Sequence, residues 1–133
     1  MTKKEYTRLN TEWLEAKSSE PDVHRAASGV FYKILASGDS SKPSPRPNSV
    51  VTVHYTGRTI DNHVFDSSRD DAVPPAFRLR DLITGWIEAL QLMHPGDRWE
   101  LYIAADKAYG KQSQPDIPGG STLIFDIELI SVA

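Results

Sequence analysis

The chain contains no cysteine, and this absence excludes several kinds of chemistry. Disulfide bonds, thiolate metal sites and a cysteine nucleophile all require that residue. No apolar run approaches the roughly 18 residues of a membrane-spanning helix, so we expect no membrane span. The N-terminus also lacks the apolar core of a signal peptide. The sequence as written is therefore expected to be cytoplasmic, or periplasmic or lipid-anchored if a signal segment has been removed.

Common catalytic and ligand-binding motifs are also missing. The sequence has no Walker loop, no G-x-S-x-G and no G-x-G-x-x-G. Its four histidines, His24, His54, His63 and His94, do not have the spacing of metal ligands, so we expect no metal site. We expect His54 and His63 to form a cross-strand pair on an outer sheet face instead. With 15 basic and 18 acidic residues, the net charge of −3 argues against nucleic-acid binding.

The 133 residues are enough for one domain, and its organising segment is a predicted helix over residues 82–93. Apolar side chains recur in this segment at spacings of three and four, at Leu82, Ile83, Trp86, Ala89, Leu90 and Met93. Asp81 is placed to cap the start of the helix. Gly85 lets a ligand or another backbone approach closely. Trp86, the next residue, is therefore either a core side chain or the floor of a pocket.

A second amphipathic helix is predicted over residues 3–17. Thr2 and Glu5 have the spacing of a capping box, and the apolar stripe of the helix consists of Tyr6, Leu9, Trp13 and Leu14. Residues 18–28 are polar and include a proline, so we interpret them as a linker with one helical turn near residues 22–26. The predicted division is an N-terminal helical extension and linker, 1–28, followed by one folded domain, 29–133.

Strands account for most of the remaining pattern. Segments that are rich in β-branched and aromatic residues, or that alternate between apolar and polar residues, lie at 29–35, 50–57, 63–68, 77–79, 98–103 and 123–129. The economical arrangement is an α+β fold, in which a twisted antiparallel sheet of five to six strands curls over the central helix. The short N-terminal helix would be an extension of this body.

Six of the aromatic residues lie at the end or on the inner face of an element around the central helix: Tyr55, Phe65, Phe77, Trp86, Tyr109 and Phe125. Few polar groups accompany them. This composition is typical of an apolar binding cleft with phenolic hydrogen-bond donors, and not of an acid–base or nucleophilic site. Asp66 is, from its own position, either an ordinary turn residue or a polar group of this cleft.

Five segments carry a resemblance to a known family: VHYTG at 53–57, VFDSS at 64–68, LITGW at 82–86, AYG at 108–110 and LIFDIEL at 123–129. In these motifs and their order, residues 30–132 resemble the FKBP family of peptidyl-prolyl cis–trans isomerases. The segment from Trp86 to Met93, and the short connection from Phe77 to the helix, resemble the bacterial Mip and FkpA branch most.

The resemblance implies an apolar pocket around a prolyl ring and gives these residues a place in it: Trp86 as the floor, Tyr55, Phe65, Phe77 and Phe125 as walls, Leu82 and Ile83 at the rim, and Ile117 as a lid. It also implies three polar groups beside the reacting bond. Asp66 would face the carbonyl that precedes proline. The backbone N–H of Ile83 and the hydroxyl of Tyr109 would donate hydrogen bonds to the substrate.

The implied function is isomerisation of X–Pro bonds in proline-containing polypeptides, without a cofactor. One alternative is a module that binds proline-containing partners without turnover. Another is a chaperone whose N-terminal helix is a contact or dimerisation surface. We prefer the enzyme because its motif positions are intact. We expect the helix to pack on its own sheet and the chain to be a monomer, because a stripe of four residues is a small interface. The family's macrolide inhibitors are further ligands that the resemblance implies.

Overall fold

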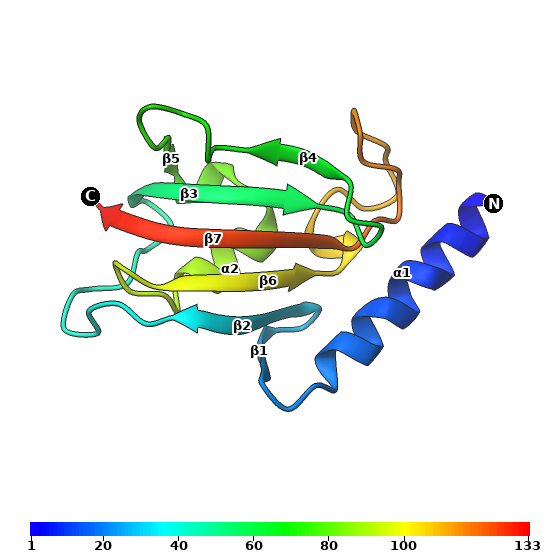
Figure 1. The fold of residues 1–133 in the computed structure, drawn as a ribbon, viewed down its shortest axis with the longest axis horizontal. Helices are drawn as coiled ribbons and strands as arrows, with labels where there is room; N and C mark the ends of the chain where they lie inside the picture. Colours follow the sequence, from blue (N-terminus) through cyan, green and yellow to red (C-terminus); the bar gives the residue numbers. More distant parts are fainter.

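Seven strands make up the body of this computed structural model, which describes all 133 residues (Figure 1). They are β1 (Val23–Ala27), β2 (Val30–Ala36), β3 (Val50–Arg58), β4 (Val64–Ser67), β5 (Ala76–Arg78), β6 (Arg98–Ile103) and β7 (Leu123–Val132). The spatial order is β1-β2-β6-β7-β3-β4, with β5 also paired to β3, and every pair is antiparallel. The predicted α+β fold is confirmed, with one strand more than the predicted upper limit.

The additional strand is β1, which lies in the stretch that we predicted to be a linker. The helical turn predicted near residues 22–26 is wrong, because the backbone there pairs with β2, with Val23 opposite Lys33 and Arg25 opposite Phe31. β1 has a neighbour on one side only, and two of its five side chains, His24 and Arg25, are exposed. Its sequence, VHRAA, lacks the apolar–polar alternation that identifies the inner strands.

The central helix is shorter than predicted. α2 covers Thr84–Leu90, and a single 3₁₀ turn, Leu79–Asp81, precedes it. Leu82 is extended, and Ile83 is the N-cap residue, so Asp81 does not cap this helix. Gly85 is buried, and a β-carbon there would lie 2.6 Å from a side-chain carbon of Ile103 in β6. Glycine thus brings the helix against the sheet.

The main core fills the space between α2 and the inner face of the sheet. Trp86, Ala89 and Leu90 of α2 are buried in it. The inner-facing residues of β7 alternate as predicted, and Leu123, Phe125, Ile127 and Leu129 are all buried in this core.

The N-terminal helix α1 (Lys3–Ser18) packs on the opposite face of the sheet, as we expected. It begins after Thr2, whose hydroxyl accepts a hydrogen bond from the Glu5 N–H at 3.1 Å. Leu14 packs with Tyr102 and Ile124, and the rings of Trp13 and Tyr102 are 5.9 Å apart. Tyr102, on the face of β6 that alternation predicts to be solvated, is therefore buried.

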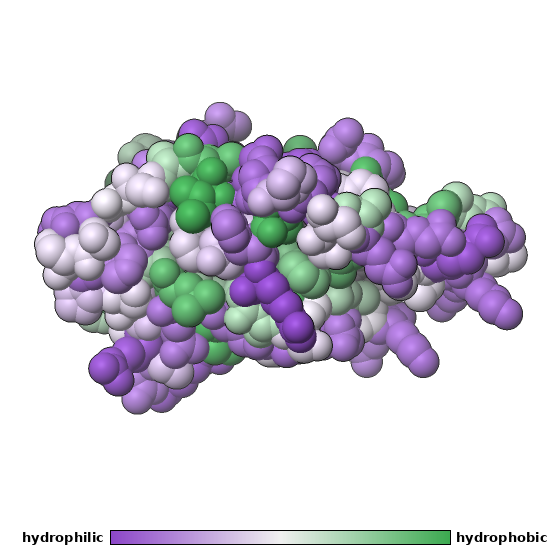
Figure 2. All heavy atoms as spheres, turned by 90° about the horizontal axis from the view of Figure 1, so that it is seen from below, coloured by the Kyte–Doolittle hydropathy of each residue, from purple (hydrophilic) through white to green (hydrophobic).

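The rest of the outer face is polar. The predicted pairing of His54 with His63 is wrong: His54 Nδ1 lies 3.0 Å from the Ser68 hydroxyl, and His63 Nε2 lies 3.6 Å from a carboxylate oxygen of Asp116. In the space-filling view of Figure 2, hydrophobic residues form patches over the body, and the end formed by α1 is mostly hydrophilic. Neither helix is both long and apolar enough to cross a membrane.

Candidate functional site

A cavity of about 410 Å³ opens beside the start of α2, between the helix and the strands around β3. Eleven residues line it: Tyr55, Phe65, Asp66, Phe77, Asp81, Leu82, Ile83, Trp86, Ala108, Tyr109 and Phe125. Nine of the ten residues that we singled out from the sequence are among them. Segments far apart in the sequence thus converge on one apolar site.

Five aromatic rings form a continuous series around this cavity. The ring of Trp86 meets those of Tyr55 and Phe125 edge to face, at centroid distances of 5.3 and 5.2 Å. The series continues from Tyr55 to Phe77 at 6.2 Å and from Phe125 to Phe65 at 5.6 Å. Edge-to-face contacts of this kind hold each ring in one orientation. The walls are therefore preformed.

Gly57 of β3 makes this arrangement of rings possible, and sequence reasoning did not single it out. A β-carbon on Gly57 would lie 2.6 Å from ring atoms of both Phe65 and Phe125. Only a residue without a side chain leaves room for the two walls to meet over the strand.

Tyr55 and Asp66 are joined by a short hydrogen bond. The Tyr55 hydroxyl donates to a carboxylate oxygen of Asp66 at 2.6 Å. Burial raises the pKa of Tyr55 far above its usual value, and the hydrogen bond to Asp66 raises that pKa further. Tyr55 therefore keeps its proton, and that proton holds the carboxylate in place.

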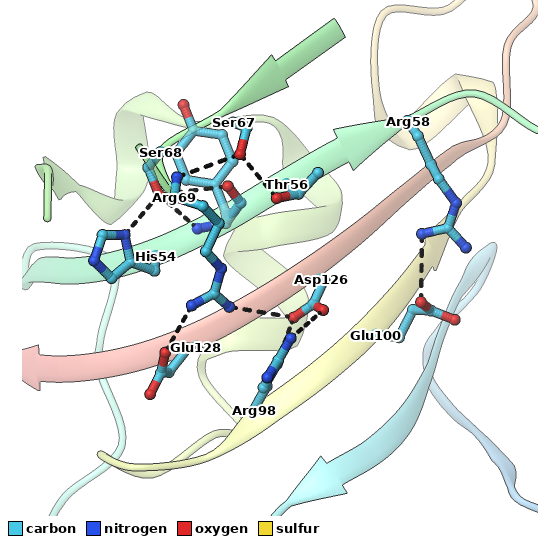
Figure 3. A network of polar contacts seen from close by, with 11 residues as sticks. His54, Thr56, Arg58, Ser67, Ser68, Arg69, Arg98, Glu100, Asp126 and Glu128 are labelled. Atoms are coloured by element: carbon cyan, nitrogen blue, oxygen red, sulfur yellow. Dashed lines mark hydrogen bonds and ion pairs between the residues drawn. The ribbon is translucent and has the colours of Figure 1, made fainter. Parts of the chain in front are cut away.

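Ser68 fixes the chain that carries Asp66. Its buried hydroxyl accepts the N–H of Tyr55 at 2.7 Å, and its own N–H donates to the Tyr55 carbonyl at 2.8 Å. The next residue, Arg69, forms ion pairs with Glu128 at 3.0 Å and Asp126 at 3.6 Å (Figure 3). The end of β4 is thus tied to both β3 and β7.

Three hydrogen-bond donors around the cavity have no partner within the protein. The Ile83 N–H precedes the first turn of α2 and reaches no acceptor. The hydroxyl of Tyr109, a residue that is 40% exposed, makes no hydrogen bond either. The indole N–H of Trp86 is buried and also unpaired. The first two donors are available to a carbonyl group at the mouth of the cavity.

Ile117 does not lie over the cavity, although we predicted that it would be a lid. Its side chain is buried in the main core and does not line the cavity. The loop around it turns back on itself, with hydrogen bonds between Gln114 and Ile117 in both directions, and this turn draws the side chain inward. Conversely, Asp81 and Ala108 line the cavity although the sequence analysis did not select them. In the sequence, only their position next to Leu82 and Tyr109 indicated that they line the cavity.

The curved sheet, the short helix and the aromatic cavity at its N-terminus define a peptidyl-prolyl isomerase domain of the FKBP class. Residues 41–130 match the sequence profile described as FKBP-type peptidyl-prolyl cis-trans isomerase, and the chain belongs to that family.

The relatives agree with this assignment. The macrophage infectivity potentiator of Trypanosoma cruzi is 45% identical over 94% of this chain and 64% of its own length. The peptidyl-prolyl cis-trans isomerase Mip of Coxiella burnetii is 44% identical over 90% of this chain and 52% of its own length. The crystal structure of a peptidyl-prolyl cis-trans isomerase from Pseudomonas syringae pv. tomato superposes with a TM-score of 0.90 at 34% identity, covering 100% of this chain and 97% of that one. The predicted Mip and FkpA branch is confirmed.

Proposed function

We propose that this protein catalyses cis–trans isomerisation of X–Pro peptide bonds in polypeptides and so assists protein folding. The observation that carries the proposal is the series of five rings around a cavity of about 410 Å³ with an unpaired Ile83 N–H at its rim. Because the chain spans only 64% and 52% of the two relatives described above, the activity is inferred from its own site.

The chemistry required is rotation about a partial double bond. Its barrier is about 20 kcal/mol, so the uncatalysed step takes roughly tens of seconds. In the twisted transition state the amide loses resonance, its nitrogen becomes pyramidal and its dipole shrinks. A dry apolar cavity solvates the planar, more polar ground state less well than water does. It therefore favours the twisted state relative to the planar one.

In this proposal the prolyl ring binds against Trp86, between Tyr55 and Phe125. The Ile83 N–H or the Tyr109 hydroxyl holds a substrate carbonyl while the prolyl side rotates. Asp66 faces the carbonyl that precedes proline, whose carbon becomes more electron-poor as resonance is lost. Phe65, Phe77 and Leu82 complete the apolar enclosure. No step transfers a proton or an electron, so the mechanism requires no cofactor.

The proposed substrates are proline-containing polypeptides, and macrolide inhibitors of the family would compete for the same cavity. We propose a monomer, because Leu14 of the apolar stripe of α1 is buried against the sheet and Trp13 packs beside it.

A protease-coupled assay tests the activity. The purified protein should accelerate cis–trans exchange in Leu-Pro and Phe-Pro peptides, because the rim of the cavity is apolar. A panel that varies the residue before proline then measures specificity. Exchange rates equal to those in buffer would contradict the enzyme and leave only binding of proline-containing partners.

A further inference from the structure

A second cleft, of about 710 Å³, lies between α1 and the loop that joins β6 to β7. It is lined by Lys3, Lys4, Thr7, Arg8, Ala105, Asp106, Gly110, Lys111, Gly119 and Gly120. A β-carbon on Gly120 would lie 2.5 Å from the Thr7 hydroxyl oxygen, so glycine allows the loop to touch the helix. Figure 1 shows α1 (blue) and this loop (yellow to orange) at the same end of the molecule.

The cleft carries uncompensated positive charge. Four of its lining side chains are basic and one, Asp106, is acidic, in a chain whose net charge is −3. Lys3, Lys4 and Lys111 form no ion pair, and Arg8 reaches only the exposed Glu12, at 3.9 Å. The cleft is therefore a local exception to the acidic character of the whole protein.

Adjacent residues of the loop between β6 and β7 line the cleft and the aromatic cavity. Ala108 and Tyr109 line the cavity, while Asp106, Gly110 and Lys111 line the cleft. Gly110 has a positive φ of 63° and no atom within 4 Å of a β-carbon built on it, so its backbone borders open space. An extended polypeptide advances about 3.3 Å per residue. A chain bound in the cavity therefore reaches the cleft within a few residues of its proline.

We propose that this cleft binds an acidic stretch of the polypeptide that flanks the proline. The inference rests on the proposed isomerase function, which places a polypeptide across Tyr109. Carboxylates of such a stretch would be attracted by Lys3, Lys4, Arg8 and Lys111. Because these charges are exposed, the attraction is moderate and is screened by salt. A nucleic acid is the less suitable anion, because the net negative charge of the protein opposes a long polyanion.

Two matched peptides test the proposal. Both contain the same Leu-Pro core with four flanking residues on each side. These flanking residues are glutamate in one peptide and glutamine in the other. At low salt we expect a KM roughly tenfold lower for the glutamate peptide, since several weak charge pairs act together. This preference should disappear at about 0.5 M salt, where the Debye length is only a few ångströms.

Charge-reversal variants locate the effect. The double variant Lys4→Glu with Lys111→Glu should have about equal KM values for the glutamate and glutamine peptides. Lys42→Glu reverses a charge on an exposed lysine outside the cleft, so this variant should still have a lower KM for the glutamate peptide. Equal KM values in the unmodified protein, or an equal loss in the Lys42 variant, would overturn the proposal.

Binding measurements separate this inference from the proposed function. Fluorescence anisotropy of the labelled glutamate peptide reports on the cleft even if neither peptide is turned over. Salt-sensitive binding that the double variant loses, without turnover, would contradict the isomerase activity but keep the acidic-segment site. Tighter binding of a single-stranded oligonucleotide, which displaces the peptide, would assign the cleft to another anion and overturn the proposal.

Discussion

Substitutions of Tyr109 and Asp66, two polar side chains of the cavity, should lower activity with little effect on stability. Tyr109→Phe removes a hydroxyl that bonds to nothing in the protein, so we expect kcat/KM to fall by about fivefold to tenfold while the unfolding midpoint stays unchanged. Asp66→Leu should also lower turnover with little loss of stability, because Asp66 is exposed, fills no core volume, and loses only a solvent-exposed hydrogen bond from the Tyr55 hydroxyl. Urea unfolding and peptide kinetics on the same samples measure both quantities. Full activity in both variants would remove these groups from the mechanism.

Phe125 is expected to behave differently, because it belongs to the core as well as to the cavity. Phe125→Ala removes a buried ring that contacts Trp86 and Phe65, at a cost of about 3 to 5 kcal/mol of unfolding free energy. Activity should fall together with stability. Chemical denaturation gives the first value and the protease-coupled assay the second. A stable and active Phe125→Ala protein would contradict the placement of this ring as a wall.

The raised pKa of Tyr55 predicts a dependence of stability on pH. Its pKa is raised above 10.0 in the folded protein, so the stabilisation is fully present below that pH and is lost as pH rises above it. Urea unfolding between about pH 9 and pH 11 should show a falling free energy of unfolding, and Tyr55→Phe should reduce this fall. Burial also raises the pKa of Tyr102, so Tyr102→Phe should reduce the fall too. An unchanged slope in Tyr55→Phe would contradict the prediction.

At the scale of elements, the sequence predicts the parts of the structure that have one buried face. β7 and β3 alternate between apolar and polar residues because one side of each strand meets the core. β1 escaped prediction because it is an edge strand with no fully buried residue. Leu82 and Ile83 fit the helical period of α2 but lie before its first turn. They face the cavity, so the helix boundary could not be read from periodicity alone.

Most residues of the candidate site could be predicted from the sequence, but the packing that shapes the cavity could not. The family resemblance selected nine of the lining residues because their motifs are local in sequence. Gly57 and Ile117 show the limit. What each does depends on contacts made across the fold, with the rings of Phe65 and Phe125 for Gly57 and with the main core for Ile117. No sequence spacing carries that information.

Asn10 shows how α1 is attached to the body. Its buried side-chain oxygen accepts the Thr122 N–H at 2.8 Å, and its side-chain nitrogen donates to the Tyr6 carbonyl at 2.8 Å. Asn10→Ala leaves the buried Thr122 N–H without an acceptor, at a cost of about 1 to 3 kcal/mol. Thr11→Ala is the matched control, because Thr11 is exposed and bonds only within the helix. Equal unfolding midpoints for both variants would show that this attachment adds no stability.

For the whole molecule, the contacts of α1 predict the effect of removing it. A chain without residues 1–17 loses the cover over Tyr102 and Ile124 but keeps every residue of the aromatic cavity. We expect a lower unfolding midpoint and nearly unchanged turnover of short peptides. Light scattering should give a monomer mass for both forms. A dimer that dissociates on truncation would instead make α1 an interface between copies and support a chaperone-like role.

The position of β7 in the sheet has a consequence for biosynthesis. The last strand of the chain lies between β3 and β6 and is the only strand that joins them. Until it emerges from the ribosome, β3 and β6 each expose an unpaired edge, and the cavity has no Phe125 wall. Pairing between segments so distant in sequence is also slow to form. A nascent chain of this protein therefore acquires its fold and its binding site together, after translation has passed the final strand.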